Sequence, residues 1–359
     1  MLFSLFFLVT IPSSCYCGKC ANCINRGEVY CVTSDDCGIF PYCFRWVKQV
    51  LNCPDYRNIT VAYDEIFART IMLKIAAASY SDDPSTCLRN SFPGIHLIND
   101  YSIECSYHED SIAHIAYSWL GYFLDRINLI NYVPPPIFSS DCSGFIATYD
   151  EKKAIVMSFR GTEGLFQLLE QVLQYHRGMK DFFDSGSIYG YFYNAFNMMW
   201  AGGMEEDVRK VLIDKSDYEL WITGFSLGGS IASVTASYIA KLGLLDPSRI
   251  KLVTFGQPRT GDYDFAAWHD RTFPYSFRVV NGRDPVPHLP PRIGPFVLFH
   301  HGVEIWYQTE MWPLSNYKVC IESDGQQCSN KVILYNIIDH MYYFETNVSD
   351  LGKYACIIK

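Results

Sequence analysis

The second half of the chain alternates between short apolar runs and longer segments whose apolar residues recur at helical intervals. The predicted elements follow in the order strand 154–159, helix 189–212, strand 218–223, helix 229–242, strand 250–255, helix 261–269 and strand 275–280. Several of these strands are nearly all apolar, as expected when helices cover both faces of a parallel sheet. The pattern therefore predicts an α/β fold with a mostly parallel central sheet.

The pattern before residue 154 predicts two helices and a strand pair. Residues 63–80 form the first helix, which ends at Ser81-Asp82-Asp83-Pro84, and its core-facing residues are Ile66, Ile71, Leu73, Ile75 and Ala78. The second helix covers about 111–128 and packs on the core in the same way. The proline run 134–136 then leads into strands near 144–148 and 154–159.

The amino-terminal region has a different composition. Residues 1–14 are apolar, too short to span a bilayer and end in small residues, which is typical of a signal peptide. Eight cysteines then crowd into residues 15–53, and we interpret this segment as a disulfide-stapled module rather than a metal site. The expected domains are thus a signal peptide (1–14), a cysteine-rich module (15–53) and a larger α/β domain (54–359).

Composition narrows the expected partners and compartment. The net charge is −9, so no basic surface is expected to neutralise nucleic-acid phosphates. Fourteen cysteines favour an oxidising, extracellular or secretory-pathway compartment. Sequons at Asn58 and Asn347 are compatible with a secreted glycoprotein, and no later apolar run is long enough for a transmembrane anchor.

The strongest chemical signal is Gly224-Phe225-Ser226-Leu227-Gly228, which stands between the predicted strand 218–223 and helix 229–242. The first and last glycines allow strand and helix backbones to approach, so a sharp turn can present the Ser226 hydroxyl at the sheet edge. The backbone N–H of Leu227 then lies at a helix N-terminus, where it can stabilise an oxyanion. This pattern predicts a nucleophilic serine.

A nucleophile elbow of this kind has its acid and then its histidine downstream. The downstream histidines are His269, His288, His300, His301 and His340. We predict His340 as the base, since it lies near the end of the domain, where a loop can return over the carboxyl edge of the sheet. We predict Asp284 as the acid because it follows strand 275–280 at that edge, whereas Asp262, Asp264 and Asp270 fall in or beside a helix.

Several ordered blocks together resemble the class 3 lipases, the fungal lipase-like branch of the α/β-hydrolases. The blocks are Ser158–Thr162, Gly224–Gly229, Thr254–Asp262, Asn281–Pro291, His301–Tyr307 and Asp339–Phe344. The resemblance covers roughly residues 80–359 and implies an α/β-hydrolase fold. It also implies Ser226 as nucleophile, Asp284 as acid, His340 as base, and Thr162 and Leu227 as oxyanion donors.

The sequence departs from the family at one catalytic position. The family usually has histidine before the nucleophile, whereas this chain has Phe225. We expect this change to alter packing beneath the elbow rather than proton transfer. His288 and His301 are expected to be structural.

The resemblance further implies two disulfides and a lid. Cys320 matches with Cys328, and Cys87 with Cys356, after which Cys105 and Cys142 pair by elimination. The stretch after Thr162 stands where the family has its lid, and its apolar residues are Leu165, Phe166, Leu168, Leu169, Val172 and Leu173. An ordinary core helix would show the same periodicity.

These expectations combine into a secreted serine carboxylester hydrolase of the triacylglycerol lipase type, which needs no metal or organic cofactor. It would act on a lipid ester at a lipid–water interface. A phospholipase A1 or feruloyl-type esterase would share every catalytic residue, and a catalytically silent lipid carrier would share the fold. Cysteine spacing predicts no partner for the amino-terminal module.

Overall fold

The computed structural model describes residues 29–31, 36–38, 61–104, 141–161, 178–292, 297–322, 324–325 and 327–357. Within the cysteine-rich module it describes only strands β1 (Val29–Cys31) and β2 (Asp36–Gly38), which pair antiparallel. The expected signal peptide, the helix at 111–128, Thr162 and the lid segment 165–173 all lie outside the described residues.

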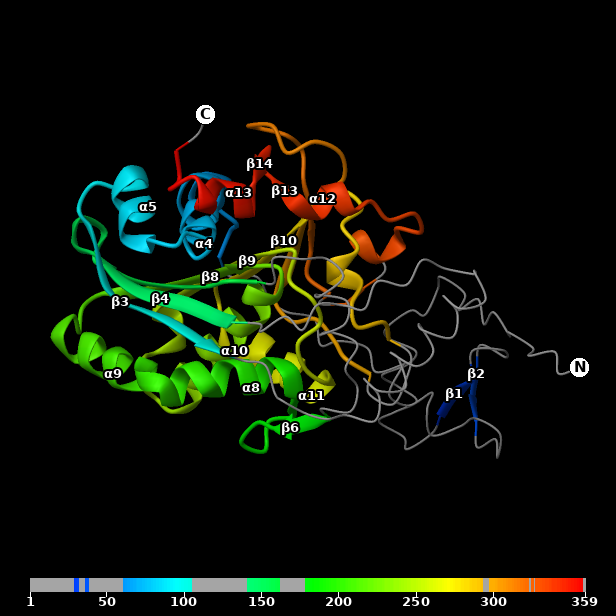
Figure 1. Ribbon diagram of the computed structural model, residues 1–359. Helices are drawn as coiled ribbons and strands as arrows, with labels where there is room; N and C mark the ends of the chain where they lie inside the picture. The colour runs from blue at the N-terminus through cyan, green and yellow to red at the C-terminus, as the bar shows by residue number, and fades with distance from the viewer. Residues whose placement is uncertain are drawn as a thin grey trace, which may run out of the picture.

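An eight-stranded sheet runs through the hydrolase domain (Figure 1) in the order β12-β11-β10-β9-β8-β5-β4-β3. Its strands are β3 (Ile95–Glu104), β4 (Asp141–Tyr149), β5 (Ala154–Phe159), β8 (Glu219–Phe225), β9 (Ile250–Phe255), β10 (Ser276–Asn281), β11 (Val303–Tyr307) and β12 (Lys318–Cys320). The five strands from β5 to β11 are parallel, whereas β3, β4 and β12 run antiparallel to their neighbours. The mostly parallel sheet is therefore confirmed.

Helices cover both faces of this sheet (Figure 1). One layer contains α3 (Glu65–Phe67), the π-helical η1 (Ala68–Met72), α4 (Leu73–Ala78), α5 (Pro84–Ser91) and α13 (Val348–Lys353). The other contains α8 (Gly190–Met199), the π-helical η4 (Trp200–Met204), α9 (Glu205–Asp214), α10 (Leu227–Lys241) and α11 (Tyr263–Thr272). This three-layer arrangement has the architecture of an α/β-hydrolase.

Shorter elements connect the layers. They are the antiparallel pairs β6 (Met179–Asp181) with β7 (Ser187–Tyr189) and β13 (Tyr342–Tyr343) with β14 (Thr346–Asn347), the helix α12 (Ile337–Met341), and the 3₁₀ turns η2 (Asp150–Lys152), η5 (Pro247–Arg249), η6 (Val286–His288) and η7 (Ser329–Lys331).

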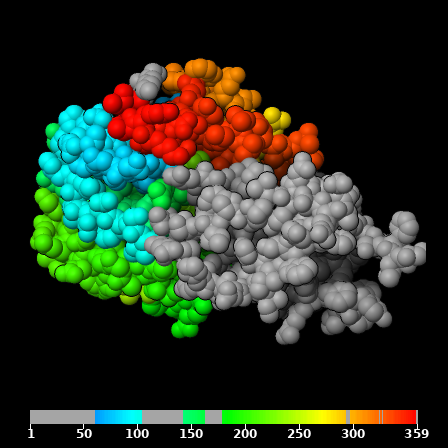
Figure 2. Space-filling model, in the orientation of Figure 1, coloured from blue at the N-terminus to red at the C-terminus, as the bar shows by residue number. Residues whose placement is uncertain are grey.

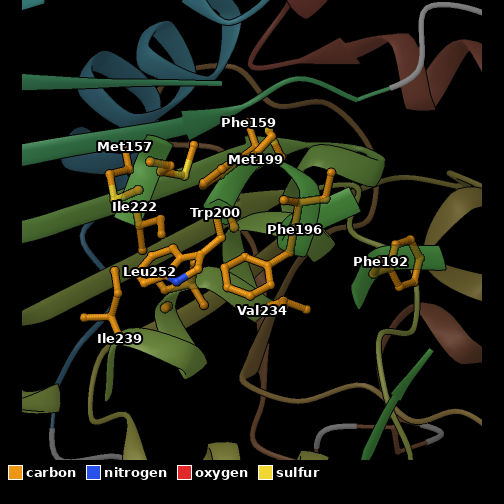
Figure 3. Close-up of a cluster of buried hydrophobic side chains, with 14 of the residues drawn as sticks. Met157, Phe159, Phe192, Phe196, Met199, Trp200, Ile222, Val234, Ile239 and Leu252 are labelled. Carbon is orange, nitrogen blue, oxygen red and sulfur yellow. The ribbon is translucent and has the colours of Figure 1, made fainter. Parts of the chain in front are cut away.

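Each face of the sheet has its own hydrophobic core. On the α8–α10 side, Met157, Ile222 and Leu252 from three adjacent strands meet aromatic side chains of α8 and η4 (Figure 3). Phe196 and Trp200 are among these aromatics. Burying side chains of this kind contributes about 1.5–3 kcal/mol each. The two cores pack helices against both faces of the sheet and so fix the positions of the strand ends.

The central elements lie close to their predicted positions, and β5 and β9 have the predicted bounds. The predicted helix 189–212 is interrupted at Gly203, whose φ is 115°. One core residue is wrong: Ile66 is 74% exposed, and the buried face of that helix begins at Ala68 instead. The stop at Asp83-Pro84 is also the start of α5, because Asp83 caps it and proline suits a first helical turn.

The two ends of the described hydrolase domain lie together. Red residues of α13 adjoin blue and cyan residues of α4 and α5 in Figures 1 and 2. A Cβ on Gly352 of α13 would lie 2.0 Å from the Ala77 carbonyl oxygen, so only glycine permits this approach. Disulfides join Cys87 to Cys356 and Cys320 to Cys328. Cys142 is also disulfide-bonded, and Cys105 lies outside the described residues.

Candidate active site

Ser226 lies in the sharp turn between β8 and α10. Its φ of 58° and ψ of −130° are unusual for a residue with a side chain. A Cβ on Gly224 would lie 2.3 Å from the Gly228 carbonyl carbon, and one on Gly228 would lie 2.1 Å from the Phe159 carbonyl oxygen. The two glycines therefore allow strand, turn and helix to pack at backbone distance, as the sequence pattern predicted.

Three side chains from distant parts of the chain meet at this turn. His340 Nε2 lies 2.9 Å from Ser226 Oγ, and His340 Nδ1 lies 2.8 Å from Asp284 Oδ2. All three residues are buried. An ionised carboxylate only accepts hydrogen bonds, so the proton is on Nδ1 and the Nδ1–H group donates a hydrogen bond to Asp284. Nε2 is then the acceptor for the Ser226 hydroxyl, which is the tautomer a general base needs.

Asp284 is held by two further donors. The backbone N–H of Val286 donates to Oδ1 over 2.8 Å, and the Tyr343 hydroxyl donates to Oδ2 over 2.6 Å. Burial raises the pKa of Tyr343 well above its usual value, and the Asp284 carboxylate raises it further. Tyr343 therefore stays neutral and donates. Sequence reasoning gave no role to this tyrosine, although it stands three residues after His340.

His340 lies on the short helix α12, which is attached to the loop that carries Asp284. The Asn336 side chain caps α12 by accepting from the Ile338 N–H. The Asp339 carboxylate accepts from the Arg283 backbone N–H over 2.7 Å, and Asn281 Nδ2 donates to the Asp339 carbonyl. The side chains of His340 and Asp284 are consequently positioned by one connected set of hydrogen bonds.

The other candidate residues take structural positions. Asp262 caps α11 by accepting from the Phe265 N–H over 2.9 Å. His301 is buried, and its Nε2 contacts the Ser233 hydroxyl and lies 3.2 Å from Gln257 Nε2. The His288 ring packs on Tyr335 with a centroid distance of 4.7 Å.

Of the two residues predicted to supply oxyanion donors, the structure describes only Leu227. Leu227 is the first residue of α10, and the first N–H groups of a helix have no partner within it. Thr162 lies outside the described residues, but its predecessor Gly161 is close to the elbow. A Cβ on Gly161 would lie 2.6 Å from the Phe225 carbonyl oxygen and 3.0 Å from Ser226 Cβ.

Phe225 packs against His340, and the expectation that it alters packing rather than proton transfer stays a prediction. Its ring stacks on the His340 imidazole, with centroids 4.8 Å apart and an interplanar angle of 27°. The Phe225 ring thus contacts the imidazole itself. The Ser226 hydroxyl meets the same imidazole at Nε2.

Within the described residues, no group of three or more His, Cys, Asp or Glu side chains is arranged to hold a metal ion. None of the described helices has the length and apolar character that crossing a bilayer requires.

Comparison with known proteins agrees with this geometry. Residues 156–293 match the family model described as lipase (class 3). A lipase of Caenorhabditis elegans is 29% identical over 326 residues, covering 82% of this chain and 83% of the relative. The chain is a class 3, fungal lipase-like protein. A Rhizopus niveus lipase is 29% identical over 212 residues, and that match covers 58% of this chain and 52% of the relative.

Solved structures show that this lipase-like chain shares its fold with fungal lipases. A lipase from Rhizopus microsporus var. chinensis superimposes with a TM-score of 0.60 at 23% identity, covering 85% of this chain and 96% of that one. The triacylglyceride lipase of Rhizomucor miehei gives a TM-score of 0.61 at 22% identity, covering 80% and 97%. At this identity the likeness concerns the fold, and chemistry has to be argued from the site itself.

Proposed function

We propose that the protein is a serine carboxylester hydrolase acting on lipid esters, with acylglycerols as the preferred substrates. The observation that carries the proposal is the continuous hydrogen-bonded series from Ser226 through His340 to Asp284. Membership of the lipase-like family and the names of the relatives support a lipid ester rather than a peptide as substrate.

In the proposed reaction, Ser226 Oγ attacks the ester carbonyl while its proton passes to His340 Nε2. Asp284 stabilises the imidazolium, and the N–H groups of Leu227 and Thr162 bind the oxyanion. His340 then gives the proton to the leaving alcohol, which leaves an acyl group on Ser226. Water, deprotonated by His340, hydrolyses this acyl-enzyme and restores the serine. No cofactor takes part in these steps.

Exposed apolar side chains around α12 support a lipid surface as the site of action. Ile333 is 87% exposed and Leu334 is 74% exposed, and Ile338 and Met341 on either side of His340 are also largely in contact with solvent. Apolar surface in water costs about 25 cal/mol per Å², and a lipid interface removes that cost. An apolar rim beside the base therefore favours docking of the active site onto lipid.

A lid is proposed over residues 165–173. When this segment opens at a lipid surface, its apolar face leaves water for lipid, and the open population increases. Activity on a short-chain ester should accelerate as the ester passes from monomers to micelles. Replacing Phe166 and Leu169 with Ser should weaken that acceleration and spare hydrolysis of a soluble ester. A smooth saturation curve in both proteins would identify the segment as core.

Secretion is proposed as well, with cleavage of a signal peptide over residues 1–14. The disulfides of the hydrolase domain support an oxidising compartment. Asn347 caps α13 through its side-chain oxygen, which accepts from the Asp350 N–H. Mass spectrometry of secreted protein would report both the mature amino terminus and any glycan at Asn347.

The decisive experiment combines a fluorophosphonate probe with a substrate panel of triacylglycerols, phospholipids and aryl esters. The probe should label Ser226, and Ser226→Ala and His340→Ala should each lower turnover by roughly 10⁴ to 10⁶. Because the groups act as a unit, the double variant should be little worse than either one. Faster phospholipid or aryl-ester turnover would identify a phospholipase A1 or feruloyl-type esterase. Wild-type protein that neither labels nor turns over would be a silent carrier.

A further inference from the structure

Phe225 contacts His340 through its ring, and the reaction above gives it no role. It is the last residue of β8, immediately precedes Ser226 and is 5% exposed. Its ring stacks on the His340 imidazole with the planes 27° apart. The face of the Phe225 ring is thus turned toward the imidazole. At position 225 the family usually has a histidine, which can be protonated.

Two tyrosines hold Phe225 in this orientation. The Tyr343 ring packs 5.8 Å from it at an interplanar angle of 64°, and the Tyr80 ring packs 6.0 Å from it at 52°. Both tyrosines also bind the site through their hydroxyls. Tyr343 donates to Asp284 over 2.6 Å, and Tyr80 accepts from the Gly161 N–H over 2.9 Å. Movement of Phe225 would therefore disturb the acid, the base and the strand end that precedes Thr162.

We propose that Phe225 is a positioning residue that holds the His340 ring in the plane joining Asp284 and Ser226 and stabilises its protonated form with the π face. The inference rests on the proposed function. The face of an aromatic ring carries negative charge density and attracts a cation lying over it by about 0.5 to 2 kcal/mol, with the larger values at desolvated sites. His340 is buried, and in the proposed reaction its ring becomes cationic when it takes the Ser226 proton.

A phenylalanine also accepts no proton of its own. The described titratable and charged groups near His340 are Asp284 at Nδ1, Tyr343 behind that carboxylate, Tyr80 behind the Phe225 ring, and Asp339 with Arg283 in the adjoining loop. A second histidine at position 225 would add a competing base and, once protonated, a repelling charge. Phe225 therefore leaves a single imidazole to carry the proton.

The test varies the charge density of the ring at constant shape. Phe225 is replaced with 3,4,5-trifluorophenylalanine, which weakens the π face, and in separate variants with Leu and His. Phe277 is the matched control, because it is a buried phenylalanine of the same core with aromatic neighbours Tyr63 and Tyr275. Trifluorination of Phe277 should leave both readouts described next unchanged.

The first readout is the titration of the His340 Cε1–H signal by NMR, which needs no turnover. Fluorination and Phe225→Leu should each move its midpoint to lower pH, by about 0.4 to 1.5 pH units. The second readout is the pH profile of kcat/KM for a soluble ester. Its acid limb should move in the same direction, with kcat/KM reduced about three- to thirtyfold and KM little changed. Phe225→His should make the acid limb steeper.

An unchanged NMR midpoint in the folded trifluorinated protein overturns the inference, whatever the activity. Equal loss of kcat/KM in the Phe225 and Phe277 variants also overturns it, since that result indicates packing alone. If the wild-type protein hydrolyses no ester, the proposed function fails, yet the NMR titration still decides whether Phe225 stabilises the protonated ring.

Discussion

Loss of the Cys87–Cys356 disulfide should destabilise the protein far more than loss of Cys320–Cys328. The first bridge joins residues 269 positions apart, and the second joins residues 8 apart. A cross-link restricts the unfolded chain in proportion to the logarithm of the loop it closes. The long bridge connects α5 to Cys356, just after α13, and so links the two ends of the hydrolase domain.

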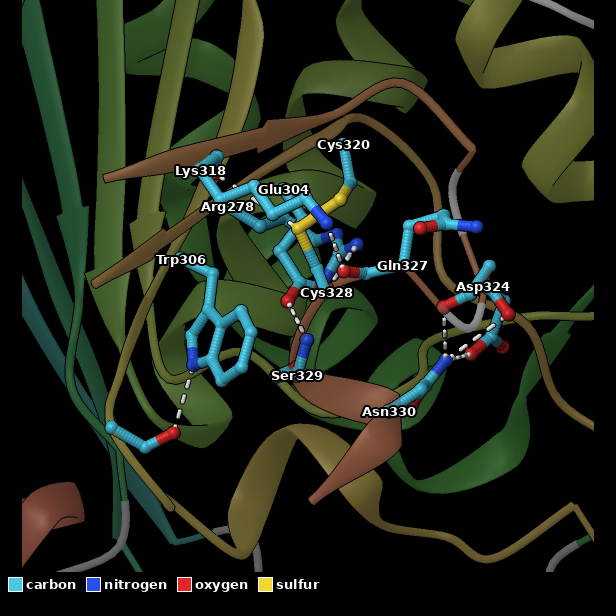
Figure 4. Close-up of a disulfide and its surroundings, with 12 residues drawn as sticks. Arg278, Glu304, Trp306, Lys318, Cys320, Asp324, Gln327, Cys328, Ser329 and Asn330 are labelled. Carbon is cyan, nitrogen blue, oxygen red and sulfur yellow. Dashed lines mark hydrogen bonds and ion pairs between the residues drawn. A yellow bond between two sulfur atoms is a disulfide. The ribbon is translucent and has the colours of Figure 1, made fainter. Parts of the chain in front are cut away.

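The loop-closure relation gives the expected sizes. At 25 °C it assigns about 5.6 kcal/mol to a loop of this length and about 2.5 kcal/mol to the short loop, a difference of about 3 kcal/mol. The short bridge closes the loop that carries Asp324, and Arg259 Nε and Nη2 lie 2.9 and 3.0 Å from the buried Asp324 carboxylate. Asn330 also binds that carboxylate (Figure 4), so we expect the pair to survive loss of the bridge.

The assay is urea unfolding of Cys87→Ala/Cys356→Ala and Cys320→Ala/Cys328→Ala, followed by tryptophan fluorescence and far-UV circular dichroism. Coincident transitions by the two probes would justify a two-state analysis of the free energy of unfolding. The m-value should rise more in the long-bridge variant, since its unfolded chain exposes more surface. If that variant loses no more free energy than the short-bridge variant, chain restriction is the wrong explanation for the bridge.

Three further predictions concern the identity of the catalytic acid, the stability of the protein at low pH, and the exposed apolar side chains around α12. Asp284→Asn should lower kcat by about 10⁴ by permitting the wrong imidazole tautomer. Asp262→Asn should remain active, because asparagine also caps a helix well. The reverse outcome would mean that Asp262, not Asp284, is the catalytic acid. Burial and the Arg278 charge hold the pKa of His300 well below 6.5. As pH falls below about 6.5, the unfolded chain binds a proton at this histidine while the folded chain does not, so the free energy of unfolding should decrease, and His300→Gln should remove that part of the shift in the urea midpoint. Ile333→Ser/Leu334→Ser should weaken sedimentation with phosphatidylcholine vesicles, while Ile213→Ser, which alters a 77% exposed residue of α9, should not; equal losses would point to general surface hydrophobicity.

The sequence predicted β5, β8, β9 and β10 because their apolar character is continuous along the chain, but it predicted no strand at β11, the fifth parallel strand. Strand β3 was missed for a physical reason. It is the edge strand, its residues 98–100 are exposed, and a register shift between Leu97 and Asn99 breaks the period of two. Ile66 was misassigned because periodicity identifies an apolar face without showing where the neighbouring layer ends.

The proposed catalytic residues could be selected from the sequence since motif, chain order and strand ends all constrain them. The contacts that hold them could not. Whether Tyr343 reaches Asp284 depends on how β13 returns across the sheet, and whether Phe225 stacks on His340 depends on the plane of a ring 115 positions away. Such contacts are set by tertiary packing and leave no local pattern.

The backbone at Ser226 shows where stability and activity oppose each other in this fold. With φ at 58° and ψ at −130°, Ser226, the proposed nucleophile, occupies a region that glycine adopts freely and that costs a residue with a side chain about 1 to 3 kcal/mol. The surrounding sheet and helix have to supply that energy, since the serine cannot relax without leaving His340. Selection for stability alone would therefore favour glycine at this position, and the serine persists at the expense of the folded state.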